Sequence, residues 1–185
     1  MDISKIKLLT QIQNSMLKYQ KENNIKKNCV TNTQVLYDIV KNNYPELQPK
    51  AKTFICYYKD CDESVFYTHL LIEVDLLGYK IIEPSYDVIK HSNVVYFENF
   101  INLKNSFANF DELDKDEIKT MLTMYLELKN VENKINNGMF QITSLEYYNN
   151  LIDYIQHDNS FLKEKLNCDF RENEYKGKRP YLHSK

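Results

Sequence analysis

The chain has very few of the residues that form tight turns, because its 185 residues include only 3 glycines and 4 prolines. It also has no tryptophan. It contains neither of the glycine-rich phosphate-binding loops, GxxxxGK[ST] and GxGxxG, and three glycines leave almost no material for them. Nucleotide enzymes that hold phosphate in such loops are therefore excluded. The same scarcity excludes collagen-like chains and chains rich in proline and glycine.

A large excess of charge of one sign is also missing. Lysine and arginine number 24 and aspartate and glutamate number 26, so the formal net charge is −2. Proteins that bind nucleic acid depend on a strongly basic surface, so we predict no nucleic-acid partner. Hydrophobic residues make up 43% of the chain and charged residues 27%, which is typical of a globular domain.

Long apolar runs are absent as well. No stretch approaches the roughly 18 apolar residues that a membrane helix requires. The N-terminal MDISKIKLLTQIQNSM alternates charged and apolar residues too quickly for a signal peptide. We therefore expect a cytoplasmic protein without membrane association, whose cysteines are thiols in a reducing compartment. The cysteines are Cys29, Cys56, Cys61 and Cys168.

Apolar spacing predicts helices at both ends of the chain and strands between them. Apolar residues recur at helical spacing over 3–21, 29–42, 111–134 and 143–157. Segments 53–58, 64–75, 79–83 and 93–97 are rich in β-branched and aromatic residues, and their short connections favour antiparallel pairing. The sequence thus predicts an α+β fold in which a small antiparallel sheet of three or four strands packs against the helix that begins near Cys29.

The predicted helix and strands could bring three residues of catalytic type close together. Cys29 opens a helix, where the helix dipole favours the nucleophilic thiolate. His69 lies in the middle of a strand, and Glu83 ends the next one. A strand histidine can take the proton of a thiol across a helix–sheet interface, and a neighbouring carboxylate can orient its imidazole.

These segments resemble the transglutaminase-like branch of the papain-like cysteine enzymes. The matching stretches are NCVTNTQVLYDIV around Cys29, AKTFICYY, and THLLIEVDLLGYKIIEPSYD around His69 and Glu83, about a third of the chain. The sequence departs from the family in having Glu83 where Asp is usual and Leu71 where an aromatic residue is common. The resemblance implies a nucleophile helix packed on a small antiparallel sheet, with base and acid on adjacent strands.

The resemblance also implies a role for each residue. Cys29 is the expected nucleophile, His69 the general base and acid, and Glu83 the residue that orients the imidazole. Papain-like enzymes often take an oxyanion donor from a side chain a few residues before the nucleophile. Asn23, six residues before Cys29, is the candidate here, and Asn24 and Asn28 are also available. No cofactor or metal is implied.

We therefore expect cysteine-dependent acyl transfer at an amide, through a thioester, in a transglutaminase-like thiol protease or amidase that acts on a peptide or protein. The predicted core spans residues 1–105, a helical extension packed on it spans 106–168, and a flexible tail spans 169–185. The alternative is a catalytically inactive relative that binds a protein partner through the C-terminal helices. The face around Met121, Tyr125, Tyr147 and Tyr148 would then be the binding surface.

Other interpretations stay open from the sequence alone. Cys56 and Cys61 form a C-x4-C pair, but no second pair follows at zinc-site spacing. The acidic cluster between Asp111 and Glu117 lacks the pattern of a calcium loop and is typical of a helix start. His91, just before a strand, could replace His69 as the base. Any one buried cysteine or histidine could also be a plain core residue.

Overall fold

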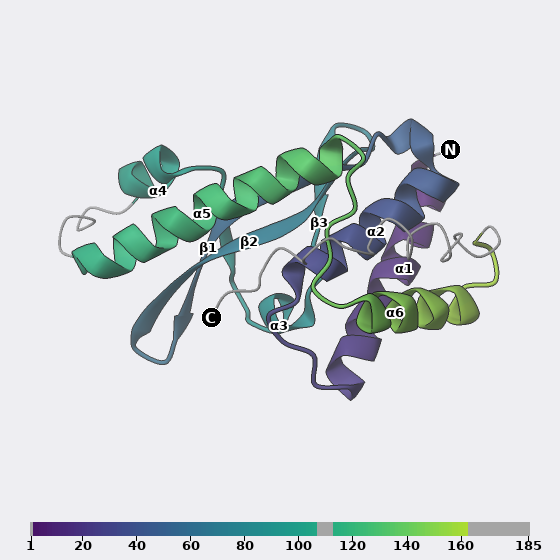
Figure 1. Ribbon diagram of the computed structural model, residues 1–185, viewed down its shortest axis with the longest axis horizontal. Coiled ribbons are helices and arrows are strands. Elements are labelled where there is room, and N and C mark those ends of the chain that lie inside the picture. The colour runs from purple at the N-terminus through teal and green to yellow at the C-terminus, as the bar shows by residue number, and fades with distance from the viewer. Residues whose placement is uncertain (1, 107–112, 163–185) are drawn as a thin grey trace.

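A computed structural model describes residues 2–106 and 113–162 of the chain (Figure 1). Its strands lie mainly between an N-terminal and a C-terminal group of helices, which is an α+β arrangement. In chain order they are α1 (Asp2–Glu22), α2 (Cys29–Asn43), the 3-10 turn η1 (Pro45–Leu47), β1 (Lys50–Asp60), β2 (Glu63–Asp75), β3 (Tyr79–Ile82), α3 (Tyr86–Ile89), β4 (Val95–Phe97), α4 (Phe100–Ser106), α5 (Lys115–Asn136) and α6 (Leu145–Asp158).

The sheet is antiparallel throughout, with four strands in the order β3-β2-β1-β4. β1 and β2 form one long hairpin whose pairing runs from Lys50 opposite Glu73 to Asp60 opposite Glu63. His69 lies in the middle of this hairpin, opposite Phe54. β3 pairs with the end of β2, so residue 83, just after β3, returns to the neighbourhood of β2.

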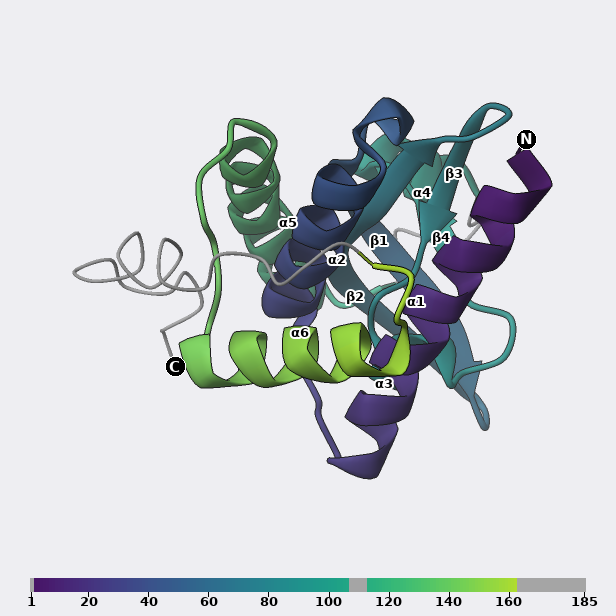
Figure 2. The ribbon, with the colours of Figure 1, turned by 90° about the vertical axis from the view of Figure 1, so that its right-hand side faces the viewer.

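Helices cover the sheet from several directions. α5 lies along β1 and β2, and α2 packs against β2 (Figure 1). Figure 2 shows α2 between α5 and α1, with α6 running across the end of this group. Side chains from α1, α2, β2, α5 and α6 form one large hydrophobic core. The predicted packing of a small antiparallel sheet against the helix that begins at Cys29 is therefore confirmed at the level of the α+β fold.

The central helix α2 is buried on every side rather than on one face. Every residue from Val30 to Val40 is buried, including Thr31, Thr33 and Asp38. A helix this enclosed must satisfy its polar side chains internally. Thr33 Oγ1 donates to the Leu70 carbonyl at 2.9 Å, and the Tyr148 hydroxyl donates to Asp38 at 2.6 Å. The first of these bonds fixes α2 against β2 at the residue beside His69.

Most predicted elements are present, with shifted ends. The helix predicted from Asp111 begins at Lys115, because the Asp114 side chain accepts hydrogen bonds from the backbone N–H groups of Asp116 and Glu117 and so caps it. Ser144 caps α6 in the same way. The short helices α3 and α4 were not predicted. Cys168 and the predicted tail 169–185 lie outside the described residues. None of the helices in the described ranges combines the length and apolar character needed to cross a membrane.

Candidate active site

Cys29 is the first residue of α2 and is partly exposed. Asn28, which precedes the helix, makes no side-chain capping bond to it. The first N–H groups of a helix have no partner within the helix, so they create a positive potential that stabilises an anion at this position. The loop before Cys29 is held by the Lys27 backbone N–H, which donates to Asp87 Oδ2 at 2.9 Å.

His69 extends from the middle of β2 and is only 2% exposed. Its ring makes an edge contact with the Tyr67 ring, with centroids 6.1 Å apart. Strand alternation places Tyr67, His69 and Leu71 on the same face. The imidazole is therefore packed between side chains of its own strand, which restricts its rotation.

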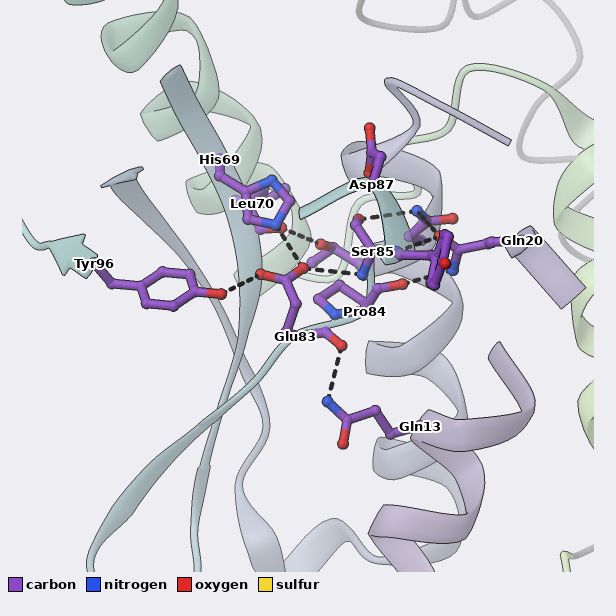
Figure 3. A network of polar contacts seen from close by, with 12 residues as sticks. Gln13, Gln20, His69, Leu70, Glu83, Pro84, Ser85, Asp87 and Tyr96 are labelled. Carbon is purple, nitrogen blue, oxygen red and sulfur yellow. Dashed lines mark hydrogen bonds and ion pairs between the residues drawn. The ribbon is translucent and has the colours of Figure 1, made fainter. Parts of the chain in front are cut away.

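Glu83 follows β3 and is 6% exposed, so its carboxylate is almost fully removed from water. Oε1 lies 2.6 Å from His69 Nε2 and accepts the Ser85 backbone N–H at 2.9 Å. Oε2 accepts the Tyr96 hydroxyl at 2.9 Å. Both carboxylate oxygens thus have partners, as a buried carboxylate requires (Figure 3).

The thiol of Cys29 interacts with the same imidazole. Burial alone would lower the pKa of His69, but the negative charge of Glu83 and a side-chain hydrogen bond with Cys29 outweigh it, so the pKa of His69 is raised well above its ordinary value. Because Nε2 faces Glu83, Nδ1 is the nitrogen left for the sulfur. Glu83 and Cys29 therefore both act on the same imidazole, and both raise its pKa.

An open cavity of about 770 Å³ gives access to this group. Cys29 and His69 both line it, together with Tyr58, Tyr67 and Val88. The opposite wall comes from α5 and consists of Met124, Glu127 and Leu128. A volume of this size can hold one or two residues of a peptide, and the lining mixes apolar surface with a few polar groups, as ligand pockets do.

Behind the carboxylate lies a second set of polar side chains that joins three helices to the segment after Glu83. Gln20 of α1 donates to the Pro84 carbonyl at 2.6 Å and accepts the Tyr86 backbone N–H at 2.9 Å (Figure 3). Asn32 of α2 donates to Ser85 Oγ at 3.0 Å. The Tyr147 hydroxyl of α6 donates to Asn32 Oδ1. These bonds fix the backbone that presents Glu83 to His69.

Sequence reasoning missed this second set and the hydrogen bond of Tyr96. One signal was available in α1. Gln13 and Gln20 are spaced seven residues apart and fall into the apolar stripe of Leu9 and Met16, where surface glutamines would not lie. Both side chains make hydrogen bonds to the segment around Glu83: Gln20 as described above, and Gln13 by donating to the Glu83 carbonyl at 3.0 Å. A polar residue in an apolar stripe therefore indicated a buried hydrogen-bond partner.

Several other candidates lie apart from this group. The Asn23 side chain is exposed and donates to the Tyr19 carbonyl at 2.9 Å, and Asn23 does not line the cavity of Cys29. His91 stacks on Tyr58, with centroids 3.9 Å apart, and does not line the cavity either. His69 is thus the histidine that the fold places beside Cys29.

The C-x4-C pair is not brought together for a metal. Cys56 is buried in β1, whereas Cys61 is exposed in the turn of the hairpin. Within residues 2–106 and 113–162, no group of three or more histidine, cysteine, aspartate or glutamate side chains could hold a metal ion.

Three of the four residues expected to form a binding face on the C-terminal helices are buried. Met121, Tyr125 and Tyr148 are buried, with exposures of 8%, 9% and 0%. Tyr147 is half-buried and bonded to Asn32. These side chains pack α5 and α6 onto the rest of the molecule, because helical spacing marks the inner face of a helix as readily as a binding surface.

Comparison of the chain with family models, curated proteins and solved structures found no significant match.

Proposed function

We propose that the protein is a cysteine-dependent acyl-transfer enzyme that acts on an amide, as a transglutaminase-like thiol protease or amidase. One observation carries the proposal. A partly exposed thiol at a helix N-terminus and a buried imidazole line the same open cavity, and the imidazole Nε2 lies 2.6 Å from a buried carboxylate. Nucleophilic catalysis by cysteine requires this order of groups. The sequence resemblance around Cys29, His69 and Glu83 supports the same activity.

The reaction begins with attack of the Cys29 sulfur on the amide carbonyl carbon, which forms a C–S bond and a tetrahedral oxyanion. The backbone N–H groups at the start of α2 stabilise the oxyanion, because they have no partner within the helix. His69 donates its proton to the leaving amine, the C–N bond breaks, and a thioester remains on Cys29. Glu83 stabilises the imidazolium throughout and holds the ring toward the sulfur.

The thioester is then resolved by water. His69, now neutral, removes a proton from the water as it attacks the thioester carbonyl. The C–S bond breaks, the carboxylic acid leaves, and the proton on His69 restores the starting state. An amine in place of water would give transamidation with the same residues.

Differential alkylation tests the proposal. The protein is treated with iodoacetamide at pH 6–7, and labelling of each cysteine is followed by mass spectrometry of proteolytic fragments. We expect Cys29 to react at least about tenfold faster than Cys56, because burial and then the charge of Glu83 raise the pKa of Cys56. The exposed Cys61 provides the rate of an ordinary surface thiol.

His69→Ala is the decisive comparison, because it removes the base and leaves the thiol in place. We expect Cys29 labelling in this variant to fall to the rate of Cys61. A catalytically inactive member of the fold would instead show Cys29 reacting no faster than Cys61 in the unaltered protein. That outcome would overturn the proposed function.

A further inference from the structure

A second cavity continues from the candidate active site along β2. It has a volume of about 480 Å³ and is lined by β2 residues 64–68, by Leu113, and by the α5 residues Asp116, Glu117, Ile118, Thr120, Met121 and Met124. Tyr67, Thr68 and Met124 line both cavities, so the two spaces meet at the residue next to His69. We call this second cavity the β2–α5 groove. A chain bound with its amide at Cys29 can therefore extend into the groove.

The groove has apolar walls and an acidic rim. Phe66, Ile118 and Met121 contribute apolar surface, and methionine adapts its shape to different side chains. The charged residues are Asp116 and Glu117, both exposed, and no lysine or arginine is among the described residues that line the groove. The groove therefore offers an apolar contact beside two exposed carboxylates.

A buried hydroxyl marks the junction of the two cavities. Thr68 is 7% exposed, and its Oγ1 has no hydrogen-bond partner among the described residues. A buried hydroxyl without a partner is costly, so such groups need an explanation such as a bound ligand. Thr53 provides a contrast, because its buried Oγ1 also has no partner but it lines neither cavity.

From these three observations we infer that the β2–α5 groove binds the peptide substrate, and that it selects an apolar residue next to a basic one. The apolar side chain packs on Phe66 and Met121, the basic side chain pairs with Asp116 and Glu117, and the Thr68 hydroxyl bonds the peptide backbone between groove and thiol. This inference rests on the proposed function, since it names the substrate class of the Cys29 site.

Peptide chloromethyl ketones test the inference, because the Cys29 sulfur displaces chloride to form a C–S bond and the rate reports binding beside it. The reference probe is a tetrapeptide with leucine and lysine at the positions farthest from the reactive end. Matched probes carry serine or glutamate in place of the lysine, or glycine in place of the leucine. We expect the reference probe to alkylate Cys29 about tenfold faster than the glycine probe and about fivefold faster than the serine probe.

Variants assign these preferences to the groove. The double variant Asp116→Asn/Glu117→Gln should remove the preference for lysine over serine. The double variant Glu22→Gln/Glu146→Gln removes the same charge from exposed sites on α1 and α6, and should keep it. Thr68→Val should lower the ratio of the reference-probe rate to the iodoacetamide rate about fivefold, whereas Thr53→Val should leave this ratio unchanged.

The outcomes separate this inference from the proposed function. If Cys29 reacts rapidly with iodoacetamide but all probes react equally, the groove proposal is overturned and the proposed function stands. If Cys29 reacts slowly with iodoacetamide, the proposed function fails. The groove is then tested by fluorescence anisotropy with a labelled Leu-Lys peptide that lacks the reactive end. Binding that is lost in Asp116→Asn/Glu117→Gln supports the groove, and absence of binding overturns it.

Discussion

The two sides of the His69 imidazole differ in how completely their polar groups are engaged. On the Glu83 side, both carboxylate oxygens have partners, and Gln20 and Asn32 hold the backbone that follows. On the Cys29 side, an open cavity separates the ring from α5, and the hydroxyl of the neighbouring Thr68 has no partner among the described residues.

This difference separates two tasks. A buried charge is tolerated only where geometry and hydrogen bonds are fixed, so the carboxylate side is built as a closed network. Under the proposed function, a substrate must displace water and make its own contacts on the thiol side, and the free surface of the cavity there allows this. Substitutions on the two sides should therefore affect different quantities.

The largest effect is expected from Glu83→Gln, which keeps the size of the side chain but removes its charge. The imidazolium formed during the reaction then loses its counter-charge, and kcat for hydrolysis of a peptide amide should fall about 10³-fold or more, as for the loss of charge in other catalytic triads. KM should change little, because Glu83 does not line the cavity.

Its matched control is Glu73→Gln, which alters a partly buried carboxylate of β2 that pairs with Lys52 at 3.2 Å. That variant should retain kcat within about threefold, since a lysine–carboxylate pair near the surface contributes little. Equal losses in the two variants would mean that Glu83 only supports the fold.

The second effect is on the pH profile. Glu83 and Cys29 raise the pKa of His69 above its ordinary 6.5, so the protonated ring survives to alkaline pH in the folded protein. The group's contribution to stability is fully present below pH 6.5 and is lost as pH rises through the raised pKa. We expect kcat/KM to begin to fall only when the pH exceeds the raised pKa of His69. Above that pKa it should fall about tenfold per pH unit.

Glu83→Gln sharpens this measurement. Without the carboxylate charge the pKa of His69 is no longer raised by it, so the alkaline limb should move to lower pH. The residual activity of the variant is sufficient for the profile, because only its shape is compared. If the alkaline fall of kcat/KM occurred at the same pH in Glu83→Gln as in the unaltered protein, a group other than His69 would control it.

The smallest effect is expected from Tyr96→Phe, which removes one hydrogen bond from Glu83 without touching His69. Burial, followed by the charge of Glu83, raises the pKa of Tyr96, so its hydroxyl remains a donor at neutral pH. The variant should lose about 1.5–3 kcal/mol of unfolding free energy and about threefold to tenfold in kcat.

Thermal and urea unfolding measure the first loss, and initial rates with a peptide amide measure the second. Tyr79→Phe, at a side chain that is 67% exposed, is the control and should change neither. A fully active and equally stable Tyr96→Phe would show that Glu83 needs no support on that side.

The elements of the fold were largely readable from the sequence because their signals are local. The apolar stripe of α1, the β-branched strands and the Ser144 cap each depend on residues close together in the chain. The short helices α3 and α4 contain too few residues for a periodic signal. Apolar spacing alone does not show that α2 is buried on all sides, because its polar faces are covered by residues as distant as Tyr148.

The residues of the candidate site also differ in whether their sequence signals are local. Cys29, His69 and Glu83 could be selected because a helix start, a strand centre and a strand end are local features. The fold brings His69 to within 2.6 Å of Glu83 and places Cys29 and His69 on one cavity, and the experiments above test their chemistry. Gln20 and Asn32 could not be paired from the sequence, since the partners meet only after the chain is folded. Asn23 was chosen by its spacing from Cys29, but the loop turns sharply at Asn24, which has a φ of 52°, and the Asn23 side chain bonds back to α1.

The hydrogen bond from Tyr147 to Asn32 sets a limit on how far the protein could be shortened. A fragment that ended after β4 would still carry Cys29, His69 and Glu83, yet it would lack the α5 wall of the cavity and the α6 hydroxyl that restrains Asn32. Transplanting the reactive residues onto another scaffold would meet the same obstacle. Helices α5 and α6 are therefore as necessary to the geometry of the candidate site as Cys29, His69 and Glu83.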